Sequence, residues 1–241
     1  MSVLLLSCSV PDDIISGARR RGFDVIAMPK SPLFDERISS HPDILLFPAF
    51  GRLFVRGADM ESAPFSEAVG DIKRLCPDME LYLTDDCGGE YPKDAAYNCF
   101  IFKNALFGLG SAISPDVLAA ANRARLDIVS VRQGYAKCSA AIIGGDAVVT
   151  SDTSIYNAAA GRGYEAHLIS QGNIRLPGYG GGLDGFIGGA SFFADGKLYF
   201  LGDIDIHPDC DIIKKAASRH GYDVVSLSDC TLFDSGCIYL E

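Results

Sequence analysis

The sequence predicts an α/β propeller in which five units, each made of two strands, a helix and a third strand, surround a pseudo-fivefold axis. Three observations predict this fold: a repeated helix end, a repeated pair of strands before each helix, and two chain ends that together supply one unit. The units recur about every 40 to 60 residues, a period typical of propellers and arrays rather than of a doubly wound sheet. We expect residues 1–241 to form one domain.

The repeated helix end is a glycine followed by an aromatic and an acidic residue, in RRGFDVI (20–26), GRGYEAHL (161–168) and SRHGYDVVS (218–226). Glycine readily adopts the left-handed conformation that ends a helix, and the residues after it favour a strand. Acidic starts and helical apolar spacing predict the helices themselves over 11–21, 152–162 and 208–220. Residues 65–83 and 113–131 are weaker copies without the glycine.

Two short apolar strands joined by a turn precede these helices. They lie in residues 44–56, 98–110, 138–152 and 188–203, with FG, KN, GGD and ADGK as the turns. The remaining unit is divided between the chain ends, because VLLLS at the start runs directly into a helix and SGCIYLE (235–241) has no helix after it. We therefore expect residues 235–241 to pair with residues 2–7 and to close the ring, which removes an exposed sheet edge.

The composition argues against several classes of protein. A net charge of −10 disfavours binding to nucleic acid or to an anionic membrane surface. No basic signal region and no long apolar segment is present, so we expect a cytoplasmic protein. The eight cysteines show no zinc-like spacing, and we expect no metal and no cofactor. Most of the cysteines are interpreted as small core residues.

The five-unit pattern resembles the pentein superfamily of guanidine-modifying enzymes, which includes arginine deiminase, agmatine deiminase, dimethylarginine dimethylaminohydrolase and amidinotransferases, and within it an uncharacterised bacterial branch. The segment SGCIYLE is similar to the terminal segment that carries the nucleophilic cysteine of those enzymes, so the resemblance assigns this role to Cys237. Residues 185–203 are similar to the unit whose first strand begins with a catalytic histidine, but here the sequence reads Ile187, Gly188 and Gly189. The expected histidine is absent.

The acidic residues with which these enzymes hold a guanidinium are absent as well. The matching strand starts read Tyr97-Asn98-Cys99 and Lys137-Cys138, and a lysine would repel a guanidinium. The superfamily also contains a non-catalytic ribosome anti-association factor, so the fold does not by itself imply an enzyme.

The geometry of such a unit predicts which loops meet at one mouth of the ring, because the loop after the second strand returns beside the start of the first. Helix N-termini at this mouth favour an anionic or zwitterionic ligand. We expect Cys237 and His207 to be the catalytic residues, and the substrate-binding residues to be Lys137, Cys138, Asn98, Asp152, Asp203, Gly188 and Gly189.

Alternatives remain for these side chains. Lys137 or His207 could activate the Cys237 thiol, yet Cys237 could equally be a core residue like Cys99 and Cys138 at equivalent places. His207 could be an ordinary loop histidine, and His41 is expected to be structural. The long loops 84–94 and 173–185 are expected to be mobile lids, the second with Arg175 and Tyr179 facing a ligand.

Two functions follow from these observations, and the sequence leaves open whether the protein is an enzyme. The first is binding of a small guanidino or amino-acid-like molecule in the central channel, with Cys237 as the nucleophile of a hydrolase or amidinotransferase. The alternative is a non-catalytic scaffold that binds a metabolite or a protein partner, which the absent histidine favours. The substrate and the oligomeric state are not predicted.

Overall fold

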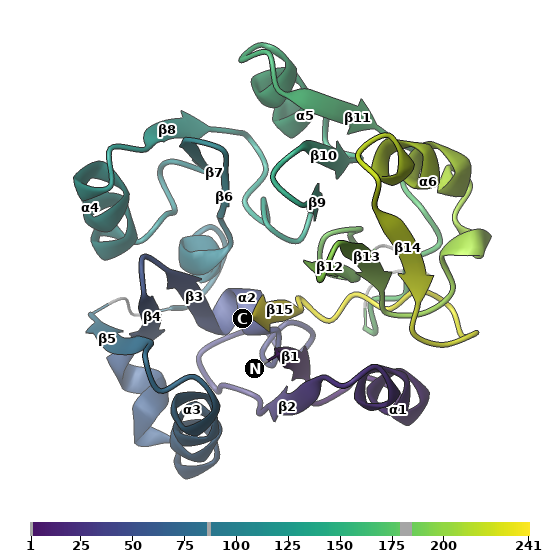
Figure 1. The fold of residues 1–241 in the computed structure, drawn as a ribbon. Coiled ribbons are helices and arrows are strands. Elements are labelled where there is room, and N and C mark those ends of the chain that lie inside the picture. Colours follow the sequence, from purple (N-terminus) through teal and green to yellow (C-terminus); the bar gives the residue numbers. More distant parts are fainter. Residues whose placement is uncertain (1, 86–87, 179–184) are drawn as a thin grey trace.

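The computed structural model describes residues 2–85, 88–178 and 185–241, and its strands form five three-stranded sheets. Figure 1 shows these sheets around the middle of the molecule, with α1, α3, α4, α5 and α6 at the periphery. The strands β3, β6, β9, β12 and β15 lie nearest the middle. This arrangement brings distant parts of the sequence together at the starts of those strands.

Four sheets repeat one connection. The first strand pairs antiparallel with the second, the second pairs parallel with the third, and a helix joins the second to the third. The elements are β3 (Leu46–Ala49), β4 (Arg52–Arg56), α3 (Ala63–Leu75) and β5 (Glu80–Thr84); β6 (Phe100–Phe102), β7 (Ala105–Gly108), α4 (Pro115–Arg123) and β8 (Asp127–Ser130); β9 (Ala140–Ile143), β10 (Ala147–Thr150), α5 (Thr153–Ala160) and β11 (Glu165–Leu168); β12 (Ser191–Ala194), β13 (Lys197–Phe200), α6 (Cys210–Ser218) and β14 (Asp223–Ser226).

The fifth sheet joins the two chain ends. Its strands are β15 (Ile238–Leu240), β1 (Val3–Ser7) and β2 (Asp24–Met28), with α1 (Asp12–Arg20) between the last two. β15 runs antiparallel to β1, with Val3 opposite Leu240 and Leu5 opposite Ile238. The sequence predicted a pairing of these two ends, and it leaves β1 with a partner on both sides.

Helix ends follow the predicted glycine pattern. Gly22, Gly163 and Gly221 have φ angles of 91°, 74° and 77°, in the left-handed region that glycine adopts without steric cost. In the fourth copy, Arg125 takes the same place with a φ of 59°. Among the described residues, no helix is long and apolar enough to span a bilayer.

The short helix α2 (Pro42–Leu45), which precedes β3, was not predicted from the sequence. Proline is favoured at the first position of a helix because its missing N–H would have no partner there. All four residues of α2 are buried. The helix carries Asp43 and directly follows His41, so it places both side chains inside the protein. Three 3₁₀ helices, η1 (Gly57–Glu61), η2 (Lys93–Tyr97) and η3 (Ile204–Ile206), lie in the connections.

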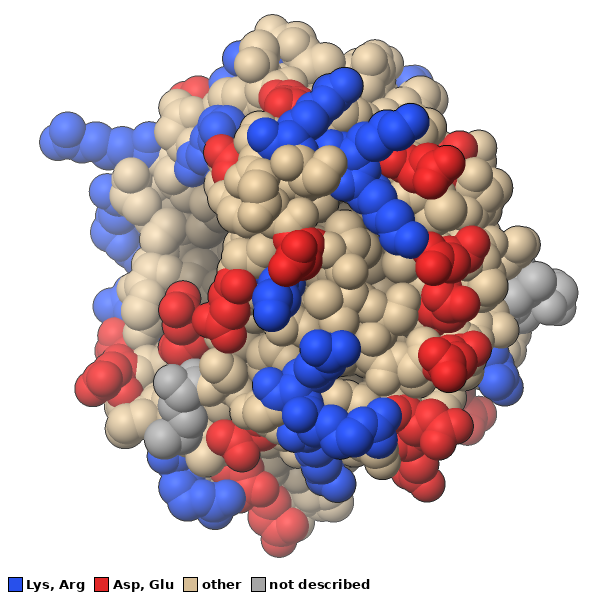
Figure 2. Space-filling model, turned by 45° about the vertical axis from the view of Figure 1, so that its right-hand side comes forward, with Lys and Arg blue, Asp and Glu red and all other residues tan. Residues whose placement is uncertain are grey.

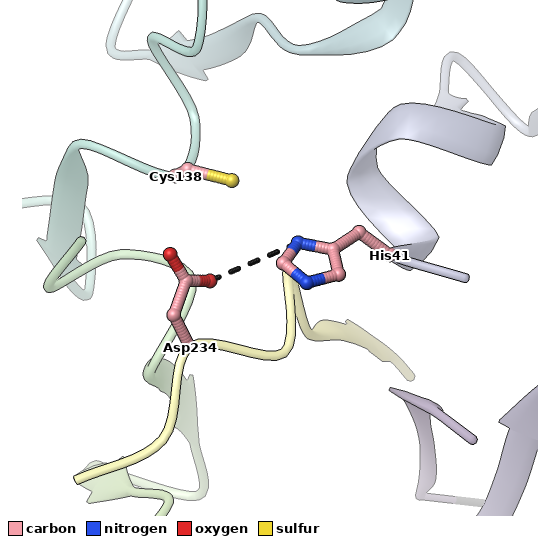
Figure 3. Close-up of side chains that lie close together, drawn as sticks. All are labelled: His41, Cys138 and Asp234. Atoms are coloured by element: carbon pink, nitrogen blue, oxygen red, sulfur yellow. Dashed lines mark ion pairs between the residues drawn. The ribbon is translucent and has the colours of Figure 1, made fainter. Parts of the chain in front are cut away.

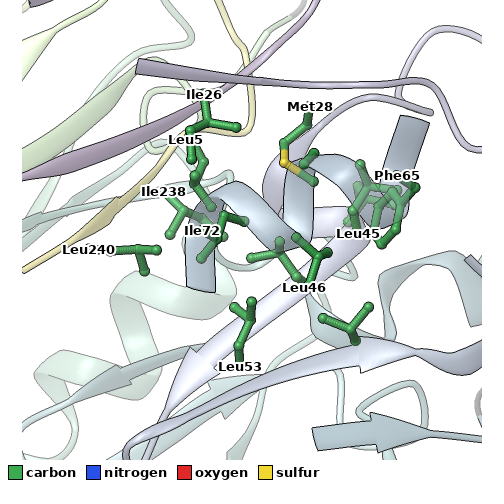
Figure 4. Close-up of a cluster of buried hydrophobic side chains, with 14 of the residues drawn as sticks. Leu5, Ile26, Met28, Leu45, Leu46, Leu53, Phe65, Ile72, Ile238 and Leu240 are labelled. Carbon is green, nitrogen blue, oxygen red and sulfur yellow. The ribbon is translucent and has the colours of Figure 1, made fainter. Parts of the chain in front are cut away.

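Apolar side chains pack the sheets against one another in five buried clusters. Figure 4 shows the cluster in which Leu5, Ile26 and Ile238 of the terminal sheet meet Phe65 and Ile72 of α3. The other four clusters join β3–β4 to β6–β7, β6–β7 to β9–β10, β9–β10 to β12–β13, and β12–β13 to β1. Each sheet therefore packs against two neighbours, and burial of one large apolar side chain contributes roughly 1.5–3 kcal/mol.

The surface contributes less to stability than this core. On the face shown in Figure 2, Lys and Arg side chains lie among Asp and Glu side chains. Exposed pairs such as Arg162 with Asp127, at 2.9 Å, and Lys30 with Glu36, at 2.8 Å, are typical of the charged surface. Such pairs are worth at most about 1 kcal/mol each.

Candidate active site at the starts of the inner strands

Six polar side chains meet where the segments preceding the inner strands converge. We call them the polar cluster: His41, Asp43, Asn98, Lys137, Cys138 and Asp234. Five of them are buried, and the side chain of Lys137 is 20% exposed. Burial of so many polar groups is costly unless they pair with one another, so their mutual contacts determine what the site can do.

The Cys138 thiol is held by two neighbours. Its Sγ donates a hydrogen bond to Asp43 Oδ2 at 2.8 Å, and Asn98 Nδ2 donates to the sulfur at 3.3 Å. The other end of the Asn98 amide accepts from the Cys138 backbone N–H at 3.1 Å, which fixes the orientation of the amide. Burial, and then the Asp43 carboxylate, raise the pKa of the Cys138 thiol well above its usual value. In the unliganded protein this thiol is therefore neutral.

His41 and Asp234 lie beside the same thiol, and Figure 3 shows the three side chains pointing toward one another. One ligand atom of each residue lies within 4.8 Å of the others, and His41 Nδ1 is 3.9 Å from Asp234 Oδ1. Burial lowers the pKa of His41 to about 4, so its imidazole is neutral at pH 7. Burial raises the pKa of Asp234 to about 6, although the backbone N–H groups of Phe186 and Gly236 donate to its carboxylate at 2.8 and 3.0 Å.

Gly189 makes room for this carboxylate, and Gly188 makes room for the neighbouring backbone. A Cβ atom at Gly189 would collide with Asp234 Oδ1, and one at Gly188 would collide with the backbone oxygens of Lys137 and Ala140. A histidine therefore has no space at Gly189, which is one of the three positions, Ile187, Gly188 and Gly189, that the resemblance to guanidine-modifying enzymes matched to the start of that strand. In this protein the Asp234 carboxylate occupies that space.

Lys137 joins three of the converging segments. Its Nζ donates to the carbonyl oxygens of Gly188, at 3.0 Å, and Cys237, and lies 3.4 Å from Asp43 Oδ2. Burial alone would lower the pKa of the ammonium, but the acidic groups around it, Cys237 and Asp43 foremost, together raise it. Lys137 is therefore charged at neutral pH, and Asp43 balances that charge.

The polar cluster adjoins two cavities. The smaller has a volume of about 170 Å³ and is lined by Ile38, His41, Ile44, Tyr135, Cys138, Leu176, Phe186 and Asp234. The larger has a volume of about 600 Å³, with Asp43, Lys137 and Gly188 among its lining residues and side chains of all five inner strands around it. The thiol, imidazole and carboxylate of Figure 3 thus face the smaller cavity.

The structure does not bring together the two residues predicted to be catalytic. Cys237 lines the larger cavity, but its Sγ donates to the Ser191 carbonyl at 3.1 Å, and its side chain belongs to an apolar cluster with Leu4 and Phe192. Burial raises the pKa of the Cys237 thiol to about 12, although Lys137 acts in the opposite direction. His207 lies after η3, accepts from the Asp209 N–H at 3.0 Å, and is not among the described residues that line either cavity.

Two other residues that were predicted to bind substrate, Asp152 and Asp203, instead cap the starts of helices. Asp152 Oδ1 accepts from the backbone N–H groups of Ser154 and Ile155 at 2.8 and 2.9 Å, at the start of α5. Asp203 Oδ1 accepts from the Asp205 N–H at 2.9 Å, at the start of η3. Of the predicted substrate-binding residues, the structure gathers Lys137, Cys138, Asn98, Gly188 and Gly189, while Asp152 and Asp203 line neither cavity.

The ends of both predicted lid loops contact residues that line the smaller cavity, Asp234 and Tyr135. Arg175 exchanges backbone hydrogen bonds with Leu232 and Asp234 at 2.7 and 2.9 Å, which fixes the segment that carries the Asp234 carboxylate. Asp94 accepts from the Tyr135 hydroxyl at 2.6 Å. Tyr179 and residues 86–87 lie outside the described residues.

Residues 5–239 match the family of unknown function DUF6873. The chain belongs to this family. Among curated proteins, no relative matches it.

Three solved structures illustrate what this DUF6873 chain is similar to. Dimethylarginine dimethylaminohydrolase from Pseudomonas aeruginosa, complexed with citrulline, has a TM-score of 0.56 at 9% identity, covering 94% of this chain and 92% of that one. Agmatine deiminase from C. jejuni gives 0.55 at 10% identity, over 98% and 92%. An amidinotransferase of the saxitoxin biosynthetic pathway of Microseira wollei gives 0.54 at 9%, over 94% and 78%. All three have the pentein fold, and the DUF6873 chain shares it.

Sequence reasoning missed three members of the polar cluster. It expected His41 to be structural and gave no role to Asp43 or Asp234. The sequence did carry a signal for His41 and Asp43. The segment HPD at 41–43 precedes an inner strand, just as Tyr97-Asn98-Cys99 and Lys137-Cys138 precede other inner strands. Asp234 has no comparable signal, since its place depends on the space left by Gly189, in the turn before β12.

Proposed function

We propose that the DUF6873 chain is a single five-bladed α/β propeller, closed by its terminal strands, that binds a small cation at the polar cluster. The pairing of β15 with β1 and the five apolar clusters, each between neighbouring sheets, support the closed ring. A closed ring supports the site because every inner strand start is held from both sides. The converging side chains are then held in place by rigid elements, as catalysis requires.

We propose further that the protein cleaves a C–N bond of a small guanidino or amidino compound with Cys138 as the nucleophile. The observation that carries this proposal is a thiol, a neutral imidazole and a carboxylate within 4.8 Å of one another beside a cavity of about 170 Å³. Neighbours of the same fold are a dimethylarginine dimethylaminohydrolase, an agmatine deiminase and an amidinotransferase. Covalent catalysis by cysteine requires a base within reach of the thiol, and His41 is neutral at pH 7.

The reaction begins with the substrate cation beside Asp234. A positive charge next to a thiol lowers its pKa. The Cys138 proton passes to the His41 imidazole as the sulfur forms its bond to the central carbon of the substrate. The C–N bond breaks as His41 returns the proton to the departing nitrogen, which leaves as ammonia or an amine. Water, or a second amine, then attacks the sulfur-linked carbon and releases the thiol.

The surroundings of the site favour a cation over an anion. No lysine or arginine is among the described residues that line the smaller cavity, whereas Asp234 lines it and Asp43 lies directly behind Cys138. Lys137, which the sequence analysis expected to repel a guanidinium, is balanced by Asp43 at 3.4 Å. The volume of about 170 Å³ limits the buried part of the substrate to a small group.

The test is a product assay with a panel of guanidino and amidino compounds. We expect wild-type protein to release ammonia or an amine from at least one of them, and Cys138→Ser to lower kcat at least 10³-fold. Cys237→Ser is the matched control and tests the nucleophile predicted from the sequence. Full activity in Cys138→Ser, with loss in Cys237→Ser, would overturn the assignment. Mass spectrometry of quenched reactions should find the covalent adduct on the peptide that contains Cys138.

A non-catalytic scaffold is the second candidate, and one observation favours it. The Cys138 thiol already donates a hydrogen bond to Asp43. Its raised pKa keeps the thiol neutral. A protein of this kind would bind the cation without turnover. Saturable binding of a guanidino compound by calorimetry, together with no product and no adduct, would support this candidate over the enzyme.

A further inference from the structure

The larger cavity carries a ring of apolar side chains, one from each inner strand. Each is the second-to-last residue of its strand, each is partly exposed, and all five line the cavity of about 600 Å³. The flanking strand residues are buried in four of the five cases. The ring residues are Pro48, Ile101, Ile142, Phe193 and Tyr239.

These five ring residues do not fill the space that they surround. Side chains at the middle of a small propeller or barrel usually interdigitate to native packing density. Here an open volume of about 600 Å³ remains, and Phe47, Phe100 and Phe192 add further apolar surface to it. Concave apolar sites of several hundred Å³ are the usual binding sites of small organic molecules. The ring therefore indicates a ligand with an apolar body.

The charged residues in the lining of the cavity determine the charge of that ligand. Lys137 and Asp43 are the charged side chains among the described residues that line it, and they are 20% and 1% exposed. An ammonium has three N–H donors, and the carbonyls of Gly188 and Cys237 accept from two of them. Asp43 Oδ2 lies 3.4 Å from Nζ and balances the ammonium, but Asp43 is almost fully buried, so the charge that a ligand in the cavity meets is that of Lys137. Because the walls are apolar, an ion pair with Lys137 is stronger than it would be in water.

We propose that the larger cavity binds an apolar molecule with a single carboxylate. The carboxylate meets the Lys137 ammonium, and the apolar body lies against the ring residues. This site is distinct from the smaller cavity that contains His41 and Asp234, and it requires no catalysis. Its failure would leave the proposed reaction at Cys138 untouched.

A head-group series tests the proposal with one tail. Octanoate, octan-1-ol and octylamine are titrated into the purified protein and binding is measured by calorimetry. We expect octanoate to bind one per chain, at least tenfold more tightly than octan-1-ol, and octylamine to bind most weakly. Octan-1-ol binding as tightly as octanoate, or no binding of octanoate, would overturn the proposal. Lys137→Met should remove the preference for octanoate.

A pair of isoleucine variants tests the location. Ile142→Glu places a negative charge in the ring, whereas Ile128→Glu changes an outer residue of β8 that is 36% exposed. We expect Ile142→Glu to weaken octanoate binding at least tenfold and Ile128→Glu to leave it unchanged. Ile101→Glu repeats the test on another strand should Ile142→Glu not fold, as judged by circular dichroism. Unchanged octanoate binding in a folded ring variant would place the ligand elsewhere and overturn the proposal.

Discussion

Cys138 and Cys237 both lie just before an inner strand, yet their thiols have opposite surroundings. The Cys138 thiol is hydrogen-bonded to Asp43 and Asn98 and lies beside His41. The Cys237 sulfur donates to a backbone carbonyl and belongs to an apolar cluster between two sheets. The comparison shows that equivalent places in a structural repeat do not give equivalent chemistry. What decides is the set of side chains that other segments bring to the sulfur.

The largest expected effect comes from the His41 imidazole, which lies beside Cys138 but not in the apolar cluster around Cys237. We expect His41→Asn to lower kcat on a guanidino substrate by about 10²–10⁴-fold, because the thiol loses its base and the leaving nitrogen its acid. Steady-state kinetics measures the change. His167→Asn is the matched control, since His167 pairs with Glu165 on an outer strand. If His41→Asn retained full kcat, the difference between the two cysteine environments would have no catalytic meaning.

The second effect is the pH dependence of the free energy of unfolding, to which His41 and Asp234, two titrating groups beside Cys138, contribute. The folded pKa of His41 is about 4, below its ordinary value of 6.5, so its contribution to stability is complete above pH 6.5 and is lost as pH falls toward 4. The folded pKa of Asp234 is about 6, above its ordinary value of 3.8, so its contribution is complete below pH 3.8 and is lost as pH rises through 6. The two dependences oppose each other in the wild type.

Single variants should separate these contributions. Relative to wild type, we expect the free energy of unfolding of Asp234→Asn to rise between pH 4 and pH 6.5, on the order of 2 kcal/mol, and that of His41→Asn to fall. Urea denaturation at pH 4.5, 5.5 and 6.5 measures both. The free energy of unfolding of Cys237→Ala should change with pH in parallel with that of the wild type. Parallel curves for all variants would show that neither group is perturbed by burial.

The third effect concerns packing around Cys237. We expect Cys237→Ala to lower the free energy of unfolding by about 1–2 kcal/mol, because it removes a buried sulfur from a close-packed apolar cluster. The kcat should stay at the wild-type level. Urea denaturation and the product assay check the two statements. A stable Cys237→Ala protein without activity would reverse the roles of the two cysteines.

The smallest effect is in chemical reactivity. Chloroacetamidine is a cation and chloroacetamide is its neutral counterpart, and both alkylate thiols. Because Asp43 and Asp234 surround Cys138, we expect the cation to alkylate Cys138 about tenfold faster than the neutral reagent, a difference of about 1.4 kcal/mol. Peptide mass spectrometry measures each site. Cys237 should show no such preference, and exposed Cys8 serves as the reference thiol. Equal rates for both reagents at Cys138 would contradict an anionic site.

Local sequence was sufficient to predict the repeated units. Gly22, Gly163 and Gly221 end their helices because left-handed backbone costs glycine little, and this preference acts within a few residues. The hairpin turns at 50–51 and 103–104 are local in the same way. The pairing of the two chain ends was predicted by counting the strands of each unit. The unit at the start of the chain lacked its first strand, and the end of the chain had one strand left over.

Only the tertiary structure decided which side chains meet at the middle. His41, Cys138 and Asp234 lie in segments far apart in the sequence, and their proximity depends on how the sheets pack against one another. The sequence paired Cys237 with His207 because a strand start and a returning loop were expected to meet at one mouth, but the Cys237 side chain lies in an apolar cluster and His207 is not among the described residues that line either cavity. Asp234 reaches its place because Gly189, in the turn before β12, has no Cβ. Contacts of this kind depend on how separate sheets pack against one another, which no local preference of the chain records.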